Sequence, residues 1–117
     1  MQPNIFSNIL IFKAMKIITV ETLHGMNYET LGIVSGSTIR AKNMFSDLGQ
    51  ALKNMVGGEL KGYTKMMEKA REQATSRMIA QAEAIGADAI IGVRYTTSAI
   101  MAQAAEVLVY GTAIRFV

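Results

Sequence analysis

Few residues in the chain have the capacity for catalysis, and His24 stands first among them. It is the only histidine, and the chain has no cysteine, which excludes a thiolate metal site and a papain-like enzyme. Nucleophilic catalysis needs a base held beside a nucleophile. The hydroxyl groups of Ser35, Ser37 and Thr38 have no spacing that ties them to His24. We interpret His24 as a turn residue without chemistry, and we expect no enzyme.

Three residues of the types that bind metal ions lie in or near the same turn. Glu21 and His24 are three residues apart, and Glu29 follows across the turn. Zinc needs three or four ligands, and harder ions need several oxygens. This group is a partial site, so we assign no metal ligand and expect no cofactor. A metal-binding or metal-stress protein that uses Glu21, His24 and oxygen ligands is the alternative function.

Two other patterns with chemical potential have structural explanations. Met66, Met67 and Met78 are spaced as on one face of a helix, among alanines, which is typical of core filling rather than of copper binding. The pair Gly57-Gly58 lacks the surrounding residues of a phosphate-binding loop. We interpret the pair as the break between two helices.

Composition indicates one folded domain. The chain has 117 residues, of which 50% are hydrophobic and 18% charged, with a net charge of +3. Its nearest approach to a basic cluster is interrupted by glutamates and predicts a solvated helix face, so we expect no nucleic-acid partner. That cluster consists of Lys61, Lys65, Lys69 and Arg71.

The first residues of the chain differ from the rest. The apolar stretch at 5–12 is too short for a transmembrane helix, and no basic residue precedes it as in a secretory signal. We expect residues 1–15 to be an N-terminal extension or the product of a misplaced start, with Met15 as the true start. A single domain then spans 15–117. We expect a cytoplasmic protein with no membrane partner.

Hydrophobic periodicity predicts an α+β fold in the order β-β-α-α-β-β, with an antiparallel-type sheet and both helices on one face. Gly32 and Gly36 interrupt the second strand, where we expect a bend, a bulge or a close backbone contact. Gly86 ends the second helix. The strands are predicted at 16–22, 28–41, 88–97 and 105–117, and the helices at 43–56 and 60–85. The apolar stripe of the second helix is Tyr63, Met66, Met67, Ala70, Ala74, Met78, Ala82 and Ile85.

The last two predicted strands are apolar on both faces and must be covered on both faces. Two helices in one layer cover only one face of the sheet, and monomers tolerate only small exposed apolar patches. Another copy of the chain is the simplest cover. We therefore predict a homo-oligomer, with 88–97 and 105–117 contributing to the contact.

Several segments together resemble the YbjQ-like family over residues 15–117. They are MKIITVETL at 15–23, LGIVSG at 31–36, AKN at 41–43, VGG at 56–58 with Tyr63 five residues on, KARE at 69–72, GADAIIGVRY at 86–95 and GTA at 111–113. The resemblance implies a dodecin-subunit-like fold, a homopentameric ring and a heavy-metal-binding label without an established motif. The family's usual acidic residues are replaced here by Ser37 and Thr64. No catalytic residue is carried over.

The function expected from these observations is that of a non-enzymatic homo-oligomer, a pentamer by the resemblance, with a structural role or with a small ligand or ion bound at subunit junctions. Concave junctions are where ligands bind most readily. Ser35, Gly36 and Tyr63, near the glycine-bearing turns, are the predicted ligand-binding residues.

Overall fold

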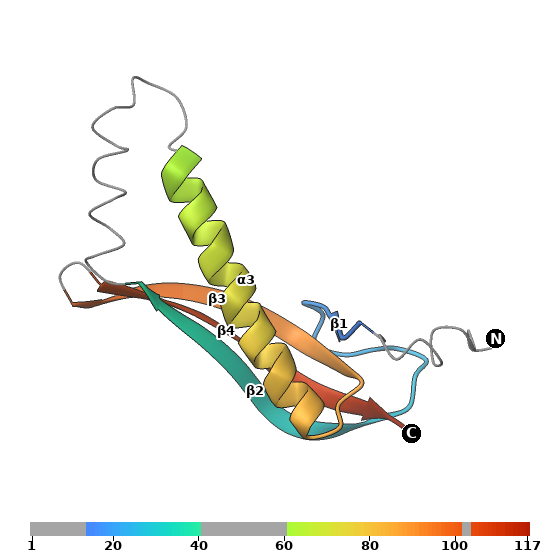
Figure 1. Ribbon diagram of the computed structural model, residues 1–117. Helices are drawn as coiled ribbons and strands as arrows, with labels where there is room; N and C mark the ends of the chain where they lie inside the picture. The colour runs from blue at the N-terminus through green and yellow to red at the C-terminus, as the bar shows by residue number, and fades with distance from the viewer. Residues whose placement is uncertain (1–13, 41–60, 102–103) are drawn as a thin grey trace.

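The computed structural model describes residues 14–40, 61–101 and 104–117. In this part the chain forms one helix and four strands in a single sheet (Figure 1). They are β1 Lys16–Ile17, β2 Tyr28–Arg40, α3 Lys61–Ala84, β3 Ala89–Met101 and β4 Ala104–Phe116. The α+β class is confirmed. The helix predicted at 43–56 lies outside the described residues.

The sheet has the strand order β1-β3-β4-β2 and is mixed. The three long strands pair in antiparallel fashion, as predicted. β1 pairs in parallel with β3, Lys16 opposite Ala89, so the predicted antiparallel-type sheet has one parallel pair at this edge. A parallel pair needs a long crossover connection. Here the intervening chain includes β2 and α3.

The first strand is much shorter than the predicted 16–22 because β3 is irregular where the two segments meet. At Gly92, whose φ is +62°, two successive N–H groups of β3 turn toward the N-terminal segment. Gly92 donates to the Val20 carbonyl at 2.7 Å, and Val93 donates to the Ile18 carbonyl at 3.0 Å. Residues 18–20 thus still bind β3, but a regular ladder ends at Ile17.

Helix α3 packs against the sheet with a face made mostly of alanines. Its fully buried side chains, four residues apart, are Ala70, Ala74, Met78 and Ala82. The Gly86 and Ala87 N–H groups return to the carbonyls of Glu83 and Ala82, which is the hydrogen-bond pattern of a Schellman cap. Ile85, predicted on the buried face, is 48% exposed because the helix ends before it. Among the described residues, no helix combines the length and apolarity that a membrane crossing requires.

Both glycine expectations in β2 are confirmed. The register against β4 shifts between Thr30 and Gly32, which marks a bulge. At Gly36 the strand touches α3 so closely that an added Cβ would stand 2.1 Å from the Ala74 carbonyl oxygen and 2.5 Å from the Met78 nitrogen. Figure 1 shows α3 crossing the sheet at an angle, with its C-terminal turns over β2.

The two faces of the sheet are covered differently. On the α3 side, one core includes Val34, Ile90 and Val109 with the buried face of the helix. On the other side, Ala89, Ile91 and Ile114 pack against residues of the 18–28 segment, such as Ile18 and Leu23. The apolar run at the start of β3 is therefore covered on both faces within one chain. Our argument that this run requires a second copy is wrong.

Candidate functional site

The structure separates the three predicted ligand-binding residues. Gly36 faces α3, and backbone atoms of the helix occupy the space that a side chain at this position would need. Ser35 is exposed, and because it alternates with Val34 and Gly36 along β2 its side chain points to the opposite face of the sheet. The Ser35 N–H donates to Gln81 Oε1 at 2.7 Å, so its backbone supports the contact with α3.

Tyr63 lies in the first turn of α3, and its side chain is outside the described part of the chain. It precedes Ala74, the residue above Gly36, by eleven positions, or about 16 Å along the helix axis. One chain therefore does not bring Gly36 and Tyr63 into one site. A site that uses both residues would have to draw them from two copies.

The acidic residues around His24 form ion pairs with arginines. Glu21 Oε1 lies 3.7 Å from an Arg94 nitrogen, and Glu29 forms a salt bridge with Arg115. His24 is in the turn between them and is exposed. Within the described ranges, no three His, Cys, Asp or Glu side chains are grouped closely enough to hold a metal ion. The described part of one chain thus does not assemble the alternative metal site.

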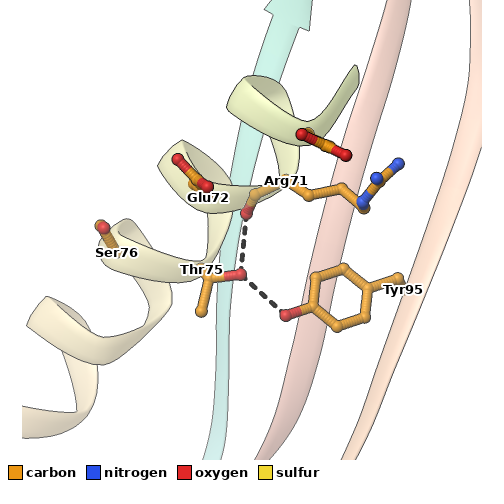
Figure 2. A pocket seen from close by; sticks show the side chains of 6 residues that line it. Arg71, Glu72, Thr75, Ser76 and Tyr95 are labelled. Carbon is orange, nitrogen blue, oxygen red and sulfur yellow. Dashed lines mark hydrogen bonds between the residues drawn. The ribbon is translucent and has the colours of Figure 1, made fainter. Parts of the chain in front are cut away.

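A different set of residues forms an open hollow of about 850 Å³ between α3 and β3. Its lining side chains are Glu68, Arg71, Glu72, Thr75, Ser76 and Tyr95. Figure 2 shows Tyr95 pointing from the strand toward α3, with Arg71 extending from the helix on the same side. The register opposite Val109, which is buried in the α3-side core, places Tyr95 on the face that the helix crosses.

Hydrogen bonds fix the Tyr95 hydroxyl. Thr75 Oγ1 donates to the Arg71 carbonyl at 2.7 Å, one turn back in the helix. Thr75 Oγ1 also lies 2.7 Å from the Tyr95 hydroxyl. Because the threonine hydroxyl has a single proton, Tyr95 must be the donor of the second bond. The phenol oxygen keeps its lone pairs as acceptors on the open side.

The hollow carries charged and polar groups. It offers one guanidinium, two carboxylates and three hydroxyl groups, and His24 lies elsewhere in the chain. These groups can hold a polar ligand by hydrogen bonds and charge. Sequence analysis missed Tyr95, although the signal was present. The run Arg94-Tyr95-Thr96-Thr97 places one aromatic residue among polar ones, directly after the apolar start of the same strand.

Comparison with known proteins gives a consistent result. The YbjQ_1 family, whose description reads "Putative heavy-metal-binding", matches residues 15–117. A UPF0145 protein of Halorubrum lacusprofundi is 53% identical over 102 residues, covering 86% of this chain and 98% of that protein. A UPF0145 protein of Clostridium novyi is 52% identical over 101 residues, with coverage of 86% and 98%.

One solved structure shares the fold. It is a protein with unknown function of the DUF74 family from Pediococcus pentosaceus, 20% identical, with a TM-score of 0.61 and coverage of 88% of this chain and 98% of that one. The names of these relatives state no activity. Because the family matches residues 15–117 and a curated relative is 53% identical over 102 residues, the chain belongs to the YbjQ_1 family.

Proposed function

We propose that the protein is a non-enzymatic binding protein, built as a ring of identical copies, that holds a small ligand where copies meet. The number of five copies comes from the family resemblance. The surface of the single chain supports the association itself. The predicted cytoplasmic location and the predicted roles of Ser35, Gly36 and Tyr63 stay predictions.

The observation that carries this proposal is a group of exposed apolar side chains on the sheet face away from α3, where Ser35 and Ser37 also lie. Ile33 is 82% exposed, Ile39 58% and Tyr110 41%. Tyr110 lies opposite Ser35 on the neighbouring strand, between the two isoleucines. Isolated exposed apolar residues are ordinary, but a group on adjacent strands is typical of an interaction surface. A second copy would remove these side chains from water.

The hollow at Tyr95 supports the position of the ligand. Beyond Val93, the outer edge of β3 has no strand partner among the described residues, since β1 ends at Ile17. Tyr95 belongs to this part of β3. A copy docked along the edge would convert an open hollow into an enclosed one, which is the form that ligand sites usually have.

The molar mass in solution tests the assembly. Light scattering at micromolar concentration should give about 64 kDa for five copies of the 12.7-kDa chain. Ile39→Glu, which places a charge in the apolar surface, should lower the mass toward that of one chain. Ile85→Glu is the matched control, since Ile85 is similarly exposed at the end of α3, away from the sheet surface. A monomeric wild-type protein would contradict the proposal.

The family description favours metal binding as the second candidate. A titration with zinc, copper and nickel separates the two functions. Metal bound at one ion per chain, and lost in His24→Ala, would replace the first proposal with a site around Glu21 and His24. Binding that His24→Ala leaves intact would instead indicate ligands outside this turn.

A further inference from the structure

A second hollow, of about 410 Å³, lies at the other end of the sheet, between β1, the start of β3 and the segment before β2. Its apolar walls include Ile18, Leu23, Met26, Ala89 and Phe116. It borders the core on the side away from α3, to which four of these residues contribute. Volume and lining are those of a site for a small organic molecule.

Two oppositely charged side chains, Lys16 and Asp88, also line this hollow. They are neighbours because Lys16 pairs with Ala89, the residue after Asp88. Asp88 Oδ2 accepts the Phe116 N–H at 2.9 Å, which holds the carboxylate in place. The ion pairs found among the described residues join Glu21 to Arg94 and Glu29 to Arg115, so Lys16 and Asp88 form no salt bridge with each other.

We propose that this hollow binds a small zwitterion with an apolar body, namely an apolar α-amino acid. The ligand carboxylate pairs with the Lys16 ammonium, and the ligand ammonium pairs with Asp88. The apolar side chain of the ligand lies against Leu23, Met26 and Phe116.

Charge complementarity selects this class over simpler ones. A fatty carboxylate would satisfy Lys16 but would bring a second negative charge beside Asp88. An apolar amine would satisfy Asp88 and meet Lys16 with the same sign. Like charges at contact distance oppose binding. Only a ligand that carries both charges matches both side chains while its body fills the apolar part.

Isothermal titration calorimetry of the full chain tests the proposal. L-leucine, L-methionine and L-phenylalanine are the probes, and at least one should bind at one molecule per chain. The analogues 4-methylpentanoate and 3-methylbutylamine keep the leucine body but lack one of its charges. Each should bind about tenfold more weakly or worse, since a charge-assisted hydrogen bond is lost and a like charge stays unmatched.

Variants locate the binding. Lys16→Gln should weaken L-leucine binding about tenfold, whereas Lys65→Gln, on an exposed helix residue far from this hollow, should leave it unchanged. Leu23→Trp fills the hollow and should abolish binding in a protein with unchanged far-ultraviolet circular dichroism. Ile39→Glu should retain binding, which separates this site from the proposed assembly. No binding by any probe, or equal loss in Lys16→Gln and Lys65→Gln, would overturn the inference.

Discussion

At the scale of single residues, Gly36 shows how one position can explain a close contact without any ligand. Its missing side chain lets β2 approach the α3 backbone at Ala74 and Met78. Gly36→Ala should lower the free energy of unfolding by about 2–3 kcal/mol, because the clashing atoms are backbone and cannot rotate away. Urea denaturation measures this change.

Ser35→Ala is the control for that experiment. Ser35 is the neighbouring residue, but its side chain is exposed on the opposite face, and the bond that it makes to Gln81 uses the backbone. Its effect should stay within about 0.5 kcal/mol. Equal stability of Gly36→Ala and Ser35→Ala would mean that α3 can move off the strand at little cost. Gly36 would then be open to a binding role again.

At the scale of elements, α3 covers part of the free edge of β2. Arg77 donates to the Ser37 carbonyl, and Gln81 accepts the Ser35 N–H. An uncovered strand edge pairs readily with other strands. The double variant Arg77→Ala/Gln81→Ala should lose about 1–2 kcal/mol of unfolding free energy. It should also show higher-order association by light scattering.

The matched control for the edge is Glu83→Ala, an exposed position on the same helix for which the structure shows no side-chain bond to β2. It should change neither stability nor association. If the double variant scattered light no more than Glu83→Ala, the two side chains would serve α3 packing alone and not the protection of the edge.

Sequence patterns could predict elements whose cause is local. The long strands and α3 were predicted within a few residues, because β-branched runs, small residues at helical spacing and Gly86 act on their own neighbourhood. The first strand could not be bounded, since its end depends on a bulge at Gly92 in a distant strand. Its parallel pairing depends on the same distant segment.

The candidate site was predicted less well than the fold for a related reason. Gly36 was singled out for its conformational freedom, which the structure uses for packing against α3. The hollow depends on the meeting of Thr75 and Tyr95, twenty residues apart on different elements. No spacing rule within the sequence connects a helix to the strand that it crosses, so this pair could emerge only from the tertiary arrangement.

At the scale of the whole molecule, the sequence argument for assembly stays a prediction, but its premise that helices alone cover the sheet is wrong. The 18–28 segment covers the apolar start of β3, although it contains no helix. Among the residues that the structure describes, Ile33, Ile39 and Tyr110 are exposed on the face away from α3, and the outer edge of β3 beyond Val93 has no strand partner. An assembly that closes into a ring needs two different surfaces on each copy.

Proline substitution in β3 can distinguish N–H groups at the outer edge of the strand from N–H groups that bond to β4. The Ser35 N–H points away from β4, and N–H groups alternate in direction along each antiparallel strand. Through the registers of β2 with β4 and of β4 with β3, the N–H groups of Arg94 and Thr96 point toward β4, and that of Thr97 points outward. Thr97→Pro removes an outward N–H and should give a folded protein with a reduced molar mass. Thr96→Pro removes an N–H of the ladder and should lower the free energy of unfolding by about 3 kcal/mol.

The comparison of these adjacent threonines decides whether copies meet along β3. Both substitutions replace an exposed threonine with the same ring and the same restriction of φ, so the two variants differ chiefly in the direction of the N–H that is removed. Light scattering gives the molar mass, and thermal unfolding followed by circular dichroism gives the stability. A Thr97→Pro protein with the wild-type mass would exclude strand pairing at this edge. The hollow beside Tyr95 would then face solvent in the assembly, and a ligand at the junction would have to bind against Ile39 and Tyr110 instead.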